Sequence, residues 1–329
     1  MIINSKRKLK SLLHELRLKN TKIGAISGGF DVFHDGHKLA LEFSSNQVEK
    51  LFVLVNSDKS ISTYKGKLRP RNSYSQRVGL LDKNFPNNVY LKINELTPNK
   101  LLGKIKPDIY FISQEWSKSP VELKVLSEFN CKIVPHPDVE GVSTTIILNE
   151  QVKSNSAIFF DRDGTINKDF GYINKENMIE ISEKNLVTLK KFSQLPYLLF
   201  IATNQSGVAK KIISRKEFFK INNQIVKKIQ DYGGRIDKTY YDFSSSERPS
   251  KYRKPNIGMV LKAVKEFDIS LVNSWVIGDK DSDIEMGKNS NMRTILIKNN
   301  QYKYKSILKP DYEVRDLSQA YEIIMKSNF

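Results

Sequence analysis

Two short apolar stretches of this chain each end in a loop of glycine, aspartate or histidine, and this pattern limits the fold more than any other feature. Residues 22–27 (KIGAIS) lead into GGFDVFHDGH, and residues 156–160 (SAIFF) lead into DRDGT. A short apolar run is typical of a strand that a parallel sheet buries on both faces. Open α/β sheets bind ligands in the loops that follow such strands. The pattern therefore predicts an α/β protein with its sites at strand ends.

Apolar strands and helical spacers alternate along the whole chain and fall into two series. The further strand candidates are residues 51–56, 109–112 and 132–134 in the first series, and 198–202, 274–277 and 294–297 in the second. A polar stretch at residues 151–155 separates the series. We therefore expect an N-terminal helix within residues 1–21, a first parallel-sheet domain over 22–152 and a second over 153–329.

The N-terminal helix is predicted from leucines at helical spacing in residues 8–19 (KLKSLLHELRLK). Its other face is basic, so it is amphipathic. Such a helix can bind a membrane or a partner, or it can pack on its own domain. We adopt the last interpretation.

Composition excludes several classes of protein. No run of about 18 apolar residues is present, so we expect no transmembrane helix. No apolar segment follows the first basic residues, so we expect no secretory signal. The only cysteine is Cys131, which excludes an internal disulfide and a multi-cysteine zinc site. A cytoplasmic protein without a membrane partner is expected.

The formal net charge of +18 is compatible with a nucleic acid or with an anionic substrate. The basic residues are spread along the chain and form no single tail. This distribution favours a lysine-rich composition that acts on phosphate-bearing substrates over nucleic-acid binding. A homo-oligomer is compatible with the sequence.

The first loop combines two glycines with His34 and His37, between a predicted strand and a predicted helix. Glycine lets the backbone approach a phosphate, and a helix N-terminus attracts anions. Two imidazoles on that rim can stabilise charge at the α-phosphorus of a triphosphate. Paired histidines can also bind a metal ion, but no cysteine or third histidine lies near them in the sequence. A plain turn with incidental histidines is the other alternative.

This loop resembles the HxGH signature of the nucleotidyltransferase superfamily. Over residues 22–150 the chain resembles the adenylyltransferases that make ADP-heptose. The other matching segments are Asn56-Ser57-Asp58, Lys65-Gly66, Arg69-Pro70, Gln76-Arg77, Thr97-Pro98, residues 105–108 (IKPD) and residues 141–145 (GVSTT). The resemblance implies a Rossmann-like fold, ATP as substrate, and His34 and His37 as catalytic residues. The nucleotide-binding residues that it implies are Gly29, Phe30, Asp31, His34, His37, Lys65, Arg77, Ser143 and Thr144.

Two departures leave the base and the acceptor open. The heptose enzymes usually carry a Lys-Gly-Gly-Asp-Tyr segment where this chain has residues 112–116 (ISQEW). Residues 140–145 (EGVSTT) also resemble glycerol-phosphate cytidylyltransferases. CTP with a polyol phosphate therefore stays an alternative to ATP with a sugar phosphate.

The second loop places Asp161 and Asp163 two residues apart at the end of a predicted strand. One carboxylate can attack phosphorus while the other handles the proton of the leaving group. Carboxylate oxygens also suit Mg²⁺. Hydroxyl, amide, lysine and acidic groups follow in later loops, in the segments 203–207 (TNQSG), 253–255 (RKP) and 278–283 (GDKDSD). Together they predict a phosphatase that forms an aspartyl-phosphate.

These motifs resemble the haloacid-dehalogenase (HAD) superfamily and, over residues 156–325, its D,D-heptose 1,7-bisphosphate phosphatase branch. The resemblance implies that Asp161 is the nucleophile and Asp163 the general acid and base. It implies that Thr203, Asn204, Arg253 and Lys254 bind phosphate. Mg²⁺ would be held by Asp161, Asp279 and the backbone carbonyl of Asp163, with Asp283 a weaker candidate nearby.

One loop departs from this branch, which commonly carries a Cys/His zinc loop before the Arg-Lys-Pro motif. Residues 241–252 (YDFSSSERPSKY) contain neither cysteine nor histidine, so we expect no zinc. Histidinol phosphatases and polynucleotide 3′-phosphatases share the core motifs. The latter would suit the charge, but the chain has no GxxxxGK[ST] kinase loop to accompany it.

The two resemblances describe consecutive reactions. A phosphatase that removes the C7 phosphate of heptose 1,7-bisphosphate leaves the 1-phosphate that a nucleotidyltransferase consumes. The sequence therefore predicts one bifunctional enzyme with sugar phosphate and nucleoside triphosphate as substrates. The alternatives are a CTP-dependent polyol-phosphate cytidylyltransferase fused to a phosphatase, and a basic nucleic-acid-binding protein with degenerate folds.

Overall fold

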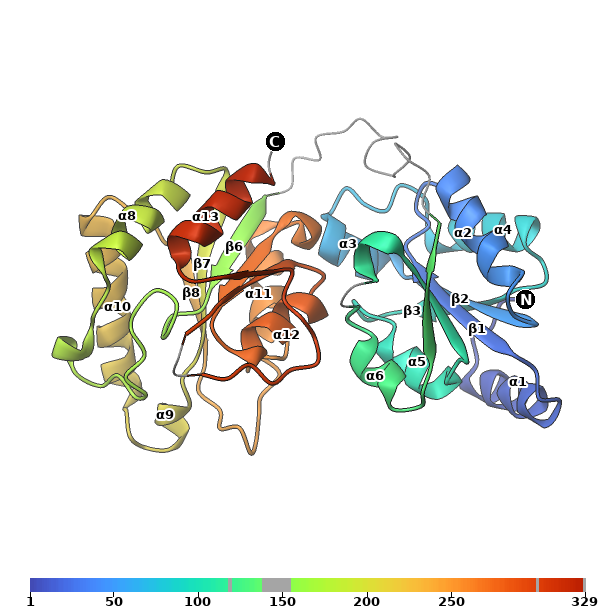
Figure 1. Cartoon of the computed structure of the whole chain (residues 1–329), viewed down its shortest axis with the longest axis horizontal. Coiled ribbons are helices and arrows are strands. Elements are labelled where there is room, and N and C mark those ends of the chain that lie inside the picture. Colours follow the sequence, from blue (N-terminus) through green and yellow to red (C-terminus); the bar gives the residue numbers. More distant parts are fainter. Residues whose placement is uncertain (118–119, 138–154, 300–301, 328–329) are drawn as a thin grey trace. The chain divides into compact units, whose positions relative to one another are not determined.

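The computed structural model describes all residues except 118–119, 138–154, 300–301 and 328–329. The chain separates into two compact units, Met1–Lys153 and Ser154–Phe329, and each is described by itself. Figure 1 shows each unit as a sheet with helices packed around it. The predicted α/β class with two parallel sheets is confirmed.

The described strands of the first unit form a five-stranded parallel sheet in the order β3-β2-β1-β4-β5. The strands are β1 (Ile23–Gly28), β2 (Lys50–Asn56), β3 (Val89–Ile93), β4 (Ile109–Ser113) and β5 (Lys132–His136). The helices are α1 (Lys6–Leu18), α2 (Asp35–Ser45), α3 (Asp58–Lys65), α4 (Tyr74–Asn84), α5 (Asn99–Ile105), α6 (Leu123–Ser127) and the 3-10 helix η1 (Gln114–Trp116). The strand order reverses between β1 and β4, which is where open α/β sheets bind ligands.

The described strands of the second unit form a six-stranded parallel sheet in the order β11-β10-β9-β6-β7-β8. The strands are β6 (Ser156–Phe160), β7 (Tyr197–Asn204), β8 (Lys238–Asp242), β9 (Trp275–Gly278), β10 (Arg293–Ile297) and β11 (Tyr312–Val314). The helices are α8 (Glu183–Phe192), α9 (Ser206–Ala209), α10 (Arg215–Asp231), α11 (Gly258–Phe267), α12 (Asp281–Asn289), α13 (Leu317–Lys326), η2 (Glu176–Met178) and η3 (Leu271–Asn273). Here the order reverses between β6 and β9.

Apolar residues on both faces of each sheet form the cores. In the second unit Ile158 and Phe160 of β6 pack with residues of α8, α10 and α13 on one face of the sheet. Helices α11 and α12 lie on the other side of that sheet in Figure 1. Burial on both faces explains why these strands have continuous apolar sequences.

Helix α1 packs on the first unit. Its Leu9 and Leu16 are buried in a cluster with Ile23, Phe52 and Leu91 of the sheet. Its apolar face is therefore covered by its own unit, as the interpretation adopted from the sequence expected. Within the described part of the chain, no helix has the length and apolar character needed to cross a membrane.

Candidate functional site

The second unit brings its acidic residues together at the point where the strand order reverses. Asp161 directly follows β6 and Asp279 directly follows β9, and these two strands are neighbours in the sheet. Asp283 lies in the first turn of α12, which begins two residues after Asp279. All three side chains are buried, although each was a loop residue in the sequence pattern.

These three carboxylates form a candidate metal centre. One oxygen from each of Asp161, Asp279 and Asp283 lies within 4.8 Å of the others. Oδ2 of Asp279 accepts a hydrogen bond of 2.8 Å from Asn299, whereas its buried Oδ1 has no hydrogen-bond partner among the described residues. Burial and then the neighbouring carboxylates raise the pKa of Asp279. A hard divalent cation bound to oxygen ligands would satisfy this donor set, so the residues present fit Mg²⁺.

Asp283 belongs to this cluster, whereas the sequence made it a weaker candidate than the other ligands. Gly278 and Gly164 show why the acids can come so close. A Cβ at Gly278 would lie 2.4 Å from Cβ of Asp283, and one at Gly164 would lie 2.2 Å from Oδ2 of Asp279. Only glycine leaves room at these two positions.

Lys254 lies against the nucleophile candidate. Its buried ammonium donates to Asp161 Oδ1 and to the carbonyl of Ala202, and it pairs with Asp283 Oδ1 at 2.6 Å. Burial raises the pKa of Asp161, and the Lys254 charge opposes that shift. The predicted phosphate-binding lysine is therefore adjacent to the carboxylate that would attack phosphorus.

Asn204 and Arg253, also predicted to bind phosphate, contact backbone groups in this structure. The amide of Asn204 accepts from the N–H of Lys254 at 3.0 Å and donates to its carbonyl at 3.1 Å. Arg253 donates from Nη1 to the carbonyl of Ser244 at 2.7 Å. Asn204 thus holds the backbone of Lys254, and Arg253 is tied to the loop before it.

Asp163 lies in a different environment from the acidic cluster. Its carboxylate accepts from Arg162 Nε at 2.9 Å and Nη2 at 2.6 Å. Gln205 Nε2 donates to it at 2.9 Å and to Thr203 Oγ1 at 2.8 Å. Its side chain is not one of the three clustered carboxylates, so it remains available for proton transfer. The predicted metal contact of Asp163 would have to come from its backbone carbonyl.

Lys210, Tyr172 and Arg253 form a cationic, hydroxyl-bearing group that we call the cationic rim. The exposed Tyr172 hydroxyl is hydrogen bonded by Lys210 and Ser206, and the Lys210 bond lowers its pKa. Lys210 also lies 5.7 Å from the centre of the Tyr172 ring, and the Arg253 charge acts on the same hydroxyl. Gly171-Tyr172 also matches the phosphatase branch in the sequence, but that match assigned no role to Tyr172. Lys210 carried no sequence signal, because it is a single residue in a loop.

In the first unit, His34 and His37 stand where α2 begins. His34 is the N-cap of α2, and its Nδ1 accepts from the N–H of His37 at 3.4 Å. The two rings stack with centroids 3.7 Å apart. Burial, together with the other imidazole, lowers the pKa of His37 to about 3, and burial lowers the pKa of His34. Both rings lie at the positive end of a helix dipole, where an anion is favoured.

Asp31 and Arg77, predicted to bind the nucleotide, hold the loops around the histidines. Asp31 pairs with Arg69 at 2.6 Å and accepts from the N–H groups of Arg71 and Asn72 at 2.7 and 3.1 Å. The buried Arg77 guanidinium donates to the carboxylate of Asp58 at 2.7 Å. It also donates to three carbonyls, those of Gly29, Asn56 and Asn72.

The other predicted nucleotide residues lie around this loop. Gly29 packs against α3, since a Cβ there would lie 3.2 Å from the Tyr64 hydroxyl. Phe30 is buried and has a φ of 48°. Burial and then the Arg69 charge lower the pKa of Lys65 to about 8. Ser143 and Thr144 lie outside the described residues.

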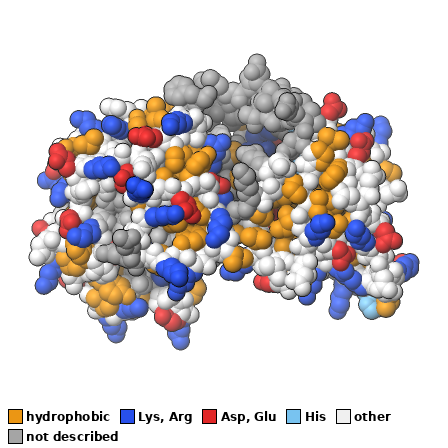
Figure 2. All heavy atoms as spheres, viewed as in Figure 1, with side chains coloured by type: hydrophobic (Ala, Val, Ile, Leu, Met, Phe, Trp, Pro, Cys, Tyr) orange, Lys and Arg blue, Asp and Glu red, His pale blue; other side chains and the backbone are white. Residues whose placement is uncertain are grey.

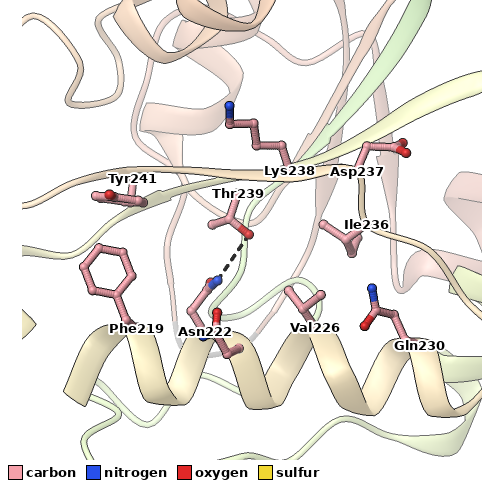
Figure 3. A pocket seen from close by; sticks show the side chains of 10 residues that line it. Phe219, Asn222, Val226, Gln230, Ile236, Asp237, Lys238, Thr239 and Tyr241 are labelled. Carbon is pink, nitrogen blue, oxygen red and sulfur yellow. Dashed lines mark hydrogen bonds between the residues drawn. The ribbon is translucent and has the colours of Figure 1, made fainter. Parts of the chain in front are cut away.

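A pocket of about 450 Å³ lies between α10 and β8 and contains none of the predicted site residues (Figure 3). Its lining includes Asn222, whose amide donates to Thr239 at 3.3 Å. On the face shown in Figure 2, Lys and Arg side chains are scattered over both units. The charge therefore shows no single patch on that face that would identify a nucleic-acid site.

Comparisons with known proteins match both units. The cytidylyltransferase-like family model matches residues 25–150, and the HAD-hydrolase-like model matches residues 251–320. The D-glycero-alpha-D-manno-heptose-1,7-bisphosphate 7-phosphatase of Campylobacter jejuni is 38% identical over 147 residues, which are 45% of this chain and 84% of that protein. The D-glycero-beta-D-manno-heptose-1,7-bisphosphate 7-phosphatase of Pasteurella multocida is 34% identical over 43% of this chain and 81% of that protein.

A solved structure is also similar to part of this chain. The D,D-heptose 1,7-bisphosphate phosphatase of B. bronchiseptica, complexed with magnesium and phosphate, is 20% identical with a TM-score of 0.47. The match covers 52% of this chain and 99% of that chain.

Proposed function

The chain belongs, through its C-terminal domain, to the family of heptose-1,7-bisphosphate 7-phosphatases, and we propose that it converts heptose 1,7-bisphosphate into a nucleotide-activated heptose. The C-terminal domain removes the C7 phosphate, and the N-terminal domain transfers a nucleotidyl group to the remaining 1-phosphate. The arrangement of Asp161, Lys254 and Asp163 at the reversal of the strand order carries this proposal. Its product would supply lipopolysaccharide or capsule assembly from the cytoplasm.

The phosphatase reaction uses the two aspartates in turn. A carboxylate oxygen of Asp161 attacks the C7 phosphorus and the bond from phosphorus to the sugar oxygen breaks. Asp163 gives its proton to that oxygen, then takes a proton from the water that attacks the aspartyl-phosphate. Inorganic phosphate leaves and Asp161 is restored. Lys254 donates to Asp161, and the Thr203 hydroxyl shares the Gln205 amide with Asp163; both groups would stabilise the transferring phosphoryl group.

Mg²⁺ would be held by Asp161, Asp279 and Asp283, where its charge would offset that of the phosphate and of the clustered acids. The two relatives differ in the anomer that their names give, alpha in one and beta in the other. We infer that the second phosphate of the substrate meets Lys210, Tyr172 and Arg253. These groups are a cationic and hydroxyl-bearing rim, which suits a phosphate dianion.

The nucleotidyl transfer needs no general base. An oxygen of the sugar 1-phosphate attacks the α-phosphorus of the nucleoside triphosphate, and pyrophosphate leaves. The phosphate nucleophile is already anionic near neutral pH, so catalysis consists of positioning and charge neutralisation. His34 and His37 would position the phosphates by hydrogen bonds at the start of α2, where the positive end of the helix dipole offsets the phosphate charge. We propose ATP as the donor. CTP with a polyol phosphate is the second candidate, since residues 140–145 also fit that class.

Phosphorus NMR tests the proposal in one experiment. The purified protein is incubated with Mg²⁺, heptose 1,7-bisphosphate of each anomer, and a mixture of ATP, CTP and GTP. Inorganic phosphate and a new sugar-diphosphonucleoside signal are expected, and the nucleotide consumed identifies the base. If the bisphosphate is inert, heptose is removed as the substrate. Polyol phosphates with CTP are then compared.

A further inference from the structure

Residues 243–253 connect the edge strand β8 to Lys254, and their fold is organised around one buried carboxylate. Asp242, the last residue of β8, is only 6% exposed. Its Oδ1 accepts from the N–H of Ser244 at 2.9 Å and from the Ser244 hydroxyl. Its Oδ2 accepts from the hydroxyl of Ser250, eight residues further along the chain. The carboxylate therefore joins the two ends of the loop.

The two serines extend this connection. The Ser244 hydroxyl accepts from the N–H of Ser250 at 3.0 Å, and the Ser250 hydroxyl accepts from the N–H of Tyr252 at 3.0 Å. Each hydroxyl donates its proton to Asp242 and accepts from a backbone N–H. Asn256 adds a hydrogen bond of 2.8 Å to the carbonyl of Ser250. We call Asp242, Ser244 and Ser250 the carboxylate hub.

The carboxylate hub is hydrogen bonded to residues of the proposed phosphatase site. Arg253 donates to the carbonyl of Ser244, so the guanidinium is held by a residue of the hub. The backbone N–H of Gln205 donates to the carbonyl of Asp242 at 2.7 Å, and the Gln205 side chain reaches Asp163. Lys254, the next residue after Arg253, is held separately by Asn204. The carboxylate hub therefore fixes the position of the Arg253 side chain, whereas the backbone of Lys254 is held by Asn204.

We propose that Asp242 is a positioning residue that sets Arg253 for substrate binding, and that its carboxylate organises the loop without a metal ion. This inference rests on the proposed phosphatase function. The loop contains neither cysteine nor histidine, and charge-assisted hydrogen bonds to Asp242 hold it in place of a metal ion. Loss of the carboxylate leaves two serine hydroxyls and a backbone N–H without their acceptor, so the Ser244 backbone that holds Arg253 loses its anchor.

Steady-state kinetics on the full chain test this proposal. Asp242→Ala should raise KM for the sugar bisphosphate by roughly ten- to a hundredfold, since each lost hydrogen bond weakens the placement of Arg253. The value of kcat should change by less than about threefold, because Asn204 still holds Lys254. Asp242→Asn keeps one oxygen acceptor and should restore part of the lost affinity. Ser246→Ala is the matched control, since Ser246 lies in the same loop but outside the hub.

A double-mutant cycle separates positioning from general destabilisation. If Asp242 acts through Arg253, Asp242→Ala should cause no further rise of KM in an Arg253→Ala background. The proposal would be overturned if the two substitutions raised KM independently, so that their factors multiply in the double variant. A fall in kcat that parallels a loss of thermal stability would also overturn it. Ser250→Ala, which removes a single hub hydroxyl, should show a smaller KM effect in the same direction and keeps the test valid if Asp242→Ala does not fold.

Two further controls test whether the loop needs a metal ion and whether heptose 1,7-bisphosphate is the substrate. Protein stripped with a chelator and reloaded with Mg²⁺ alone should recover its original KM, and a requirement for Zn²⁺ would contradict the metal-free loop. If the wild-type protein does not hydrolyse heptose 1,7-bisphosphate, the proposed function fails. The same cycle is then run with a sugar bisphosphate that it does hydrolyse, such as fructose 1,6-bisphosphate, so the role of Asp242 is still decided.

Discussion

Single buried acids in this chain are stabilised by different partners, and these partners decide what each acid can do. Asp163 is paired with Arg162, Asp31 with Arg69, and Asp242 with two serines. Asp279 keeps a buried oxygen without a hydrogen-bond partner among the described residues. A buried charge needs a partner, so the unsatisfied oxygen in the acidic cluster points to a cation, whereas the paired acids point to structure or proton transfer.

Asp283 gives a direct test of the metal centre. Asp283→Asn keeps an oxygen but removes one negative charge, so the Mg²⁺ concentration for half-maximal phosphate release should rise by about tenfold or more. Glu285→Gln on the same helix is the control, since Glu285 accepts from Ser306 and is outside the cluster. Removal of Mg²⁺ should abolish phosphate release. An unchanged Mg²⁺ dependence in the variant would show that Asp283 is not a ligand.

Glu122 should make the stability of the first unit depend on pH. Burial raises the pKa of Glu122 from 4.5 to about 7, while Tyr110 donates to its carboxyl at 3.2 Å. The folded state therefore holds a proton that the unfolded state has lost, and stability falls as pH rises from about 4.5 to about 7, by about 3 kcal/mol in all. Glu122→Gln keeps the acceptor oxygen and should remove this fall.

Urea unfolding of the first unit between pH 4.5 and pH 8 measures the effect. Glu128→Gln, at an exposed position a few residues away, should leave the pH dependence unchanged. Parallel curves for the wild type and Glu122→Gln would show that Glu122 does not change its protonation in this range.

At the scale of elements, side chains that bond to the backbone of another loop hold the ends of strands in position. Arg77 in α4 ties the end of β2 and the glycine loop after β1 through carbonyls of Asn56 and Gly29. Asn204 at the end of β7 holds the backbone of Lys254. Both were selected from the sequence as ligand-binding residues, and that role remains a prediction. The contacts present here are those of positioning residues.

Arg77→Lys should separate these roles. Lysine keeps the charge but loses the planar fork, so buried carbonyls lose their donors and the unfolding free energy of the first unit should fall by roughly 2–4 kcal/mol. Lys83→Ala, at an exposed position of the same helix, is the control. Urea unfolding without nucleotide provides the measurement. Unchanged stability with a raised KM for the triphosphate would assign Arg77 to substrate binding alone.

At the scale of the whole molecule, each unit carries its own core and its own proposed catalytic groups. The described hydrophobic clusters draw their residues from one unit each. The groups of the two proposed reactions likewise come from separate units. We therefore expect the two reactions to be separable by substitutions in one unit at a time.

Asp161→Asn and His37→Ala should accordingly have opposite effects. The first should reduce phosphate release by at least about a thousandfold, because the amide cannot form the aspartyl-phosphate, and leave nucleotidyl transfer from added sugar 1-phosphate unchanged. The second should reduce nucleotidyl transfer by about a hundredfold or more and leave phosphate release unchanged. Separate assays of inorganic phosphate and pyrophosphate measure both. Loss of both activities in either variant would contradict two independent sites.

Sequence alone determined the α/β class, the two series of strands, and the loops that hold His34, His37, Asp161 and Asp163. These features depend on local pattern, because burial on both faces of a parallel sheet produces continuous apolar strands, and parallel strands place their following loops at one edge. The helix interpretation for residues 8–19 is local for the same reason, since one apolar stripe at helical spacing must be covered.

Tertiary structure alone decided which polar groups meet. Asp283 joins the acidic cluster only because α12 follows β9 closely, and Asp242 meets Ser250 only because its loop folds back. The donors of Arg77 and Asn204 are engaged by backbone carbonyls from distant segments. Hydrogen bonds and ion pairs are short-ranged and directional, so their partners depend on how distant segments pack and not on any spacing along the chain.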